Sequence, residues 1–119
     1  MIVIANVLVA LVALLHVYFL VLEMFFWDKP LGRRVFNLTP EFATASKTLA
    51  ANQGLYNGFL AAGLIWGLCV TGMNGFYIKI FFLTCVIVAG LYGGYSVNRR
   101  IFFVQALPAI VALVLLHLI

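Results

Sequence analysis

The side chains of this sequence best placed to do chemistry are polar residues inside apolar stretches. The first apolar stretch holds His16 and, seven residues later, Glu23. In a helix these positions lie on nearly the same face, about two turns and roughly 10 Å apart, which is too far for direct contact. Polar groups are costly in lipid, so both side chains are expected to face the protein interior.

A second set of polar side chains opens the second apolar stretch. Gln53 and Asn57 are four residues apart and share one helix face, and Asn52 precedes them. Tyr92 and Gln105 are placed at the same depth by the helix limits given below. We expect one polar site that opens toward the cytoplasm, and its predicted members are His16, Glu23, Asn52, Gln53, Asn57, Tyr92 and Gln105.

The predicted site suits a small amphipathic or lipid-like molecule. Its polar end would meet Glu23, Gln53 and Asn57, and its tail would lie along the first helix. No metal-binding motif, phosphate-binding loop or nucleophile elbow is present, and zinc needs a tighter cluster than one deep histidine. We therefore expect no metal, while the cofactor and any catalysed reaction stay unknown at this point.

Each of these residues also has a plainer interpretation. Gln53 and Asn57 could serve only as hydrogen-bonding links between helices. Glu23 could pair with an arginine of the following loop, and His16 could be a packed histidine with its hydrogen bonds satisfied.

The composition indicates a membrane protein. Of the 119 residues, 66% are hydrophobic and 8% are charged, whereas soluble domains carry about 25% charged residues. The formal net charge is +4, but the basic residues are scattered and form no stripe, which argues against nucleic acid as a partner. We expect a single integral membrane domain over residues 1–119, with membrane lipid as its surroundings.

The first helix is predicted over residues 2–27, which is too long for the core of a signal peptide, so this helix should be retained. Residues 28–38 mix basic and apolar side chains and contain Pro30 and Gly32 as helix breakers. They are expected to form a loop in the membrane interface.

Thr39 and Pro40 form a good helix start, as cap and first position. The second helix is expected to be long, with a first part in the cytoplasm, and to end at a tight turn over residues 71–75. Pro108 should kink the last helix. The fold class is therefore all-α, a bundle of four transmembrane helices over residues 2–27, 40–72, 76–95 and 101–119.

Charge and glycine spacing predict orientation and packing. The loops after the first and third helices carry most basic residues, which places them in the cytoplasm and both termini outside. The pairs Gly54/Gly58, Gly63/Gly67 and Gly90/Gly94 predict close helix packing and a homo-oligomer. Two cysteines inside apolar stretches, Cys69 and Cys85, should be free thiols.

Four segments carry a family resemblance over essentially the whole chain. They are residues 22–25 (Leu-Glu-Met-Phe), 35–42 (Val-Phe-Asn-Leu-Thr-Pro-Glu-Phe), 49–59 (Leu-Ala-Ala-Asn-Gln-Gly-Leu-Tyr-Asn-Gly-Phe) and 105–108 (Gln-Ala-Leu-Pro). The chain resembles the domain of unknown function 1304 family, which are small bacterial membrane proteins. The resemblance implies four membrane helices in the bacterial inner membrane and carries over no established activity.

A fainter resemblance is to the membrane-associated eicosanoid and glutathione metabolism superfamily. Those proteins have four helices, external termini and a polar run with an asparagine at the start of the second helix, and they form trimers with a site between subunits. This chain has Ala50 and Ala51 before Asn52 and no basic residue in the fourth helix, so it lacks that superfamily's arginines. The resemblance therefore does not imply glutathione chemistry.

Three functions remain open on the sequence. The first is an enzyme or binding module for a lipid-like molecule. The second is a proton-coupled exporter that resembles the small multidrug resistance proteins, although their glutamate lies deep in the first helix, where this chain has His16. The third is a structural subunit that assembles through its glycine faces.

Overall fold

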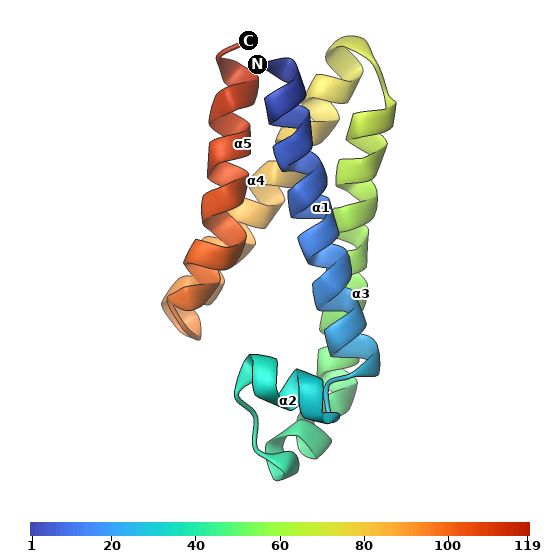
Figure 1. The fold of residues 1–119 in the computed structure, drawn as a ribbon, viewed down its shortest axis with the longest axis vertical. Helices are drawn as coiled ribbons and strands as arrows, with labels where there is room; N and C mark the ends of the chain where they lie inside the picture. Colours follow the sequence, from blue (N-terminus) through green and yellow to red (C-terminus); the bar gives the residue numbers. More distant parts are fainter. The chain divides into compact units, whose positions relative to one another are not determined.

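The computed structural model describes residues 1–119 and is helical throughout, with no strand (Figure 1). The all-α class predicted from the sequence is confirmed. Two compact units are present, Leu15–Phe59 and the combination of Met1–Leu14 with Leu60–Ile119. The helices are α1 (Ile2–Phe25), α2 (Pro30–Phe36), α3 (Pro40–Cys69), α4 (Gly72–Ser96), a π-helix (Phe102–Ala106) and α5 (Leu107–His117).

Two of these helices could cross a membrane by their length and composition, α1 with 24 residues and α4 with 25. At 1.5 Å per residue each is longer than the hydrocarbon core of about 30 Å. The apolar segment Phe102–His117 is shorter. In α3 the polar residues Asn52, Gln53 and Asn57 interrupt the apolar run that was predicted to form the second span.

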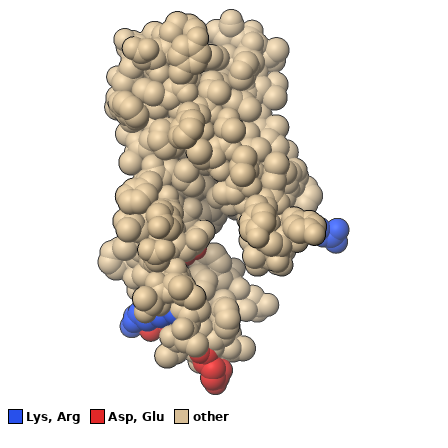
Figure 2. Space-filling view, turned by 180° about the vertical axis from the view of Figure 1, so that it is seen from behind, with Lys and Arg blue, Asp and Glu red and all other residues tan.

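The larger unit has an aliphatic core rich in small residues, which lets its helices approach closely. The core residues are Ala5, Val9, Val12, Ala13, Leu64, Leu83, Val86, Ala109, Ala112 and Leu116. The exposed surface is also apolar, and large side chains such as Leu14, Phe81 and Val88 are more than half exposed. Figure 2 shows few charged side chains on the visible face. Monomeric soluble proteins rarely expose so much contiguous apolar surface.

The predicted interfacial loop over residues 28–38 is wrong in its secondary structure, because Pro30–Phe36 forms α2. Pro30 lies in the first turn, where a missing N–H costs nothing and the fixed φ suits a helix. Gly32 lies against the Phe26 carbonyl, where a larger residue would clash. The helix ends at Asn37, which adopts the left-handed conformation with φ 56°. The two supposed breakers are thus part of the helix.

The start of α3 is as predicted. Thr39 accepts a hydrogen bond from the Phe42 N–H through its side-chain oxygen, at 3.2 Å. The turn that follows α3 is shorter than predicted, because α3 ends at Cys69 and α4 already begins at Gly72. Gly72 has a φ of 77°, which a residue with a side chain adopts only with strain.

The last helix differs from the predicted single helix over residues 101–119. Phe102–Ala106 form a π-helix near its start, and the Leu107 N–H bonds to the Phe102 carbonyl five residues back. Pro108 follows Leu107 and has no N–H to continue the regular ladder. The π-helical segment was not predicted, and the kink at Pro108 stays a prediction.

The glycines of the larger unit lie at contacts between its own helices. A Cβ built on Gly67 would meet Lys79 Cγ at 2.7 Å, and Gly63 lies against Phe82. A Cβ on Gly90 would come within 2.7 Å of the Ala106 backbone nitrogen. The glycine pairs that suggested association between copies therefore have a packing role within the chain.

Candidate functional site

The structure brings together two of the predicted site residues, Glu23 of α1 and Asn57 of α3. The Asn57 side-chain amide donates a hydrogen bond to Glu23 Oε1 at 2.5 Å, and Asn57 is 6% exposed. Both residues belong to the Leu15–Phe59 unit. The carboxyl therefore has a neutral partner on the neighbouring helix.

Two glycines of α3 allow this contact. A Cβ built on Gly54 would lie 3.0 Å from Glu23 Cβ and 2.7 Å from Met24 Cγ, and one on Gly58 would lie 2.6 Å from Leu20 Cδ1. Because α3 has no side chains at these points, its backbone approaches α1 closely. Asn57 lies between the two glycines in sequence, so its short side chain can reach Glu23.

Glu23 was alternatively expected to pair with a loop arginine, and the structure does not support that pairing. The ion pair of this unit joins Lys47 Nζ to Asp28 Oδ2 at 3.2 Å. The Lys47 side chain donates a hydrogen bond to Asp28 and thereby lowers the pKa of that carboxyl. The Nε–H group of Arg33 is buried without a hydrogen-bond partner. The ion pair of this region therefore does not include Glu23, whose hydrogen-bond partner is Asn57.

The remaining predicted residues of this unit lie around the pair without joining it. His16 is fully buried in α1, two turns before Glu23, and its ring meets the Phe19 ring edge-on at 5.6 Å. Asn52 and Gln53 are exposed on α3, and neither side chain bonds to Glu23. Gln53 shares a helix face with Asn57 but is exposed, and the printed hydrogen bond to Glu23 comes from Asn57.

The last two predicted residues, Tyr92 and Gln105, belong to the other unit. Tyr92 is exposed and lies at one end of an apolar groove of about 500 Å³ formed by α4 alone. Gln105 is half-buried in the π-helix. Their place in one site with Glu23 stays a prediction.

Sequence reasoning missed a second buried polar pair, in the larger unit. Lys79 is only 7% exposed, and its Nζ donates a hydrogen bond to Asn6 Oδ1 at 2.9 Å. Neither Lys79 nor Asn6 is among the residues predicted for the site. The available signal was the place of Lys79 eight residues into an apolar helix, because a lysine so deep needs a partner.

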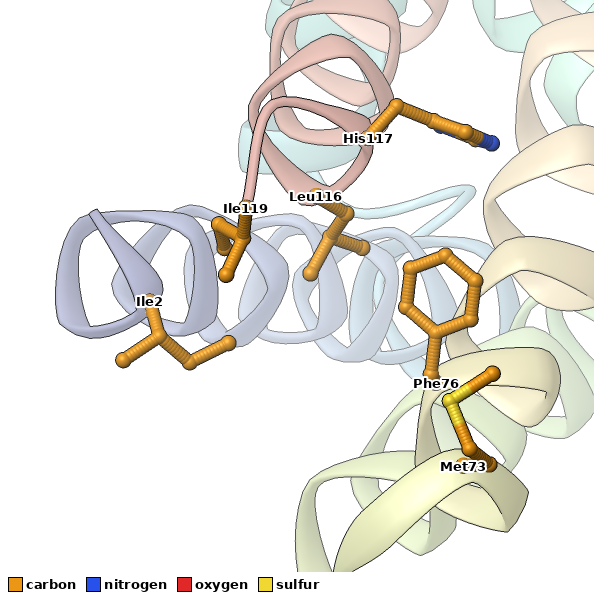
Figure 3. A pocket seen from close by; sticks show the side chains of 6 residues that line it. All are labelled: Ile2, Met73, Phe76, Leu116, His117 and Ile119. Atoms are coloured by element: carbon orange, nitrogen blue, oxygen red, sulfur yellow. The ribbon is translucent and has the colours of Figure 1, made fainter.

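The same unit has a pocket at the end where both chain termini lie (Figure 3). Its volume is about 310 Å³, at the lower limit of ligand sites. His117 is its polar member, and its Nδ1 donates a hydrogen bond to the Leu113 carbonyl at 2.9 Å, because a carbonyl oxygen can only accept. The other lining residues are Ile2, Met73, Phe76, Leu116 and Ile119.

Comparison with known proteins gives a family model and a relative. The family model, described as a protein of unknown function (DUF1304), matches residues 10–117. The uncharacterized protein YpaA of Lactococcus lactis subsp. lactis (strain IL1403) is 34% identical over 116 residues, which cover 96% of this chain and 97% of that protein. No solved structure matches the chain. The fainter resemblance to the eicosanoid and glutathione superfamily gains no support.

Proposed function

The chain belongs to the DUF1304 family of proteins of unknown function, and we propose that it is a multi-pass membrane protein that binds a small amphipathic molecule. The Glu23–Asn57 pair would hold the polar end of that molecule. The observation that carries the proposal is a carboxyl on a membrane-capable helix whose partner is an amide and not a cation.

The membrane part of the proposal rests on four helices in an up-and-down arrangement. Ile2, Met73 and Ile119 line one pocket, so both termini and the turn between α3 and α4 lie at the same end of the larger unit. Arg99 and Arg100 follow α4 at its other end. Both termini outside, with these arginines in the cytoplasm, agree with this arrangement and with the positive-inside rule.

The binding part of the proposal rests on the unused capacity of Glu23. A carboxyl can accept several hydrogen bonds, and Asn57 supplies one of them at Oε1. An amide also brings no positive charge to the carboxyl. A ligand with an ammonium or another strong donor would supply both the missing charge and a further hydrogen bond, while its tail would lie on the apolar surface.

A proton-coupled exporter is the second candidate, and the same observation favours it. A carboxyl with a neutral partner can exchange a proton for a cationic substrate, whereas one held by an arginine cannot do so readily. Export requires movement of the ligand across the membrane, and binding alone does not.

The test compares three twelve-carbon amphiphiles, dodecylamine, dodecanol and dodecyl sulfate, on the protein in phosphatidylcholine nanodiscs. Dodecylamine should raise the melting temperature most, and Glu23→Gln should remove this effect while the apo protein keeps its helicity. Glu41→Gln is the matched control, because Glu41 is exposed at the start of α3. Equal effects of dodecylamine on the wild type and on Glu23→Gln would refute the binding site.

A vesicle assay then separates the two candidates. Because neutral dodecylamine crosses a bilayer unaided and carries protons with it, the measured quantity is the proton release beyond that of protein-free vesicles. An exporter should show such an excess when dodecylamine is added across a pH gradient, and Glu23→Gln should abolish the excess. Binding without any excess release would leave only the first candidate.

A further inference from the structure

We propose that α2 and the adjoining Lys29 form a docking surface for anionic phospholipids of the membrane leaflet next to α2. The inference rests on the proposed membrane location and goes beyond the Glu23–Asn57 site. It assigns a partner to a helix that the sequence did not predict.

One face of α2 is fixed to its own unit. Gly32 lies against the backbone of Phe26 and Trp27, and the ring of Phe36, one turn later, meets the Trp27 ring at 4.9 Å. The Trp27 indole N–H in turn donates to the Ser46 hydroxyl of α3 at 3.0 Å. These contacts determine which face of α2 turns outward.

The outward face combines apolar and basic side chains. Leu31 and Val35 are one turn apart and are 40% and 36% exposed. Arg34 lies between them in sequence, on the same side of the helix and also exposed. A helix with this face suits the boundary of lipid headgroups and acyl chains, where the apolar side chains enter the bilayer and the arginine meets phosphate.

The charges around α2 favour an anionic partner. The ion pair between Lys47 and Asp28 neutralises both of these residues. Three further positive charges, on Lys29, Arg33 and Arg34, then outnumber the one negative charge of Glu41 at the start of α3. Each basic residue held at an anionic membrane surface increases its affinity for that surface by about five-fold.

Arg33 adds a second, independent observation. Its Nε–H is buried without an acceptor, which is rare for a buried polar group in a folded protein. No carboxylate forms an ion pair with its guanidinium. A modest rotation of this half-exposed side chain would give its planar donor fork to a phosphate, which arginine binds in a bidentate manner.

Trp27 is the reporter in the experiment, because it lies directly under α2. Trp66→Phe leaves Trp27 as the sole tryptophan, since the chain has two. This variant is reconstituted in phosphatidylcholine vesicles that contain either brominated phosphatidylglycerol or brominated phosphatidylcholine at the same mole fraction. We expect stronger quenching of Trp27 by the anionic lipid at low salt, and a smaller preference as salt rises.

Arg33→Gln with Arg34→Gln should lower the preference for the anionic lipid roughly five-fold per residue. Arg99→Gln with Arg100→Gln is the matched control, because it removes the same charge from a different loop and should leave the preference intact. Helicity and the Trp27 emission maximum in pure phosphatidylcholine report whether each variant folds.

The possible failures are distinguishable. Quenching by neither lipid would refute the membrane location itself. Equal quenching by both lipids at low salt would refute the docking surface alone, as would a preference that survives the loss of Arg33 and Arg34 or that falls equally in the Arg99 and Arg100 control.

Discussion

Asn57 donates a hydrogen bond to Glu23 across 34 positions of sequence, and it does so between two glycines that bring α3 onto α1. In this contact a neutral amide holds the Glu23 carboxyl, which belongs to a helix long and apolar enough to cross a membrane. A pair of this kind contributes to stability and leaves the carboxyl able to take another partner. The two roles respond differently to substitution, and each can be measured.

Asn57→Ala should destabilise the protein by about 1–3 kcal/mol, because it leaves the Glu23 carboxyl without its hydrogen-bond donor. Reversible unfolding by sodium dodecyl sulfate in mixed micelles measures the difference. Asn52→Ala is the control, since Asn52 is exposed nearby on the same helix and its loss should cost no more than about 0.5 kcal/mol. Equal costs for the two variants would contradict a structural role for the Glu23–Asn57 bond.

The pair of Lys79 and Asn6 should respond asymmetrically. Asn6→Ala leaves a buried ammonium without its partner and should destabilise the protein by about 1–3 kcal/mol. Lys79→Met keeps the length of the apolar stem and removes the charge, so it should be neutral or stabilising. The same unfolding assay applies, and a large loss of stability in Lys79→Met would show that the ammonium makes a favourable interaction beyond Asn6.

The ion pair of Asp28 with Lys47 predicts a pH dependence at the end of α1. The Lys47 hydrogen bond lowers the pKa of Asp28, so its stabilising contribution is complete above the ordinary aspartate pKa of about 3.9 and is lost as the pH falls through the lowered value. Trp27 emission in a Trp66→Phe background can follow this, because Trp27 precedes Asp28 and bonds to Ser46. The midpoint should lie below about 4 and rise toward it in Lys47→Met. A transition that persists unchanged in Asp28→Asn would belong to another group.

The sequence was sufficient for the helical class and for most helix positions, because long apolar runs and the Thr39 cap are local signals. It misled at α2, since Pro30 and Gly32 were interpreted as helix breakers. A proline breaks a helix only beyond its first turn, and Gly32 is needed for a contact with Phe26 that no local pattern reveals.

The candidate site was predictable only in part, for a related reason. The predicted depth along the helices placed Glu23 and Asn57 together. Which residue bonds to Glu23, an arginine or an asparagine, depends on which faces of α1 and α3 pack against each other, and the sequence does not reveal this. The facing of α3 also leaves Gln53 exposed. The glycine pairs indicated close packing correctly. Gly63 and Gly90 contact helices of the same chain, so they give no separate reason for a homo-oligomer, which stays a prediction for light scattering in detergent.

Membrane topology is the prediction on which the others depend. In the larger unit, Ile2 and Ile119 line one pocket with Met73, whereas residue 98 follows the far end of α4. Since α4 is long enough to cross the hydrocarbon core, positions 2 and 98 should lie on opposite sides of the membrane. In a background without Cys69 and Cys85, a cysteine at position 2 should react with an impermeant maleimide added outside intact cells. A cysteine at position 98 should react only after the membrane is opened, and labelling of both from the same side would contradict the four-span arrangement.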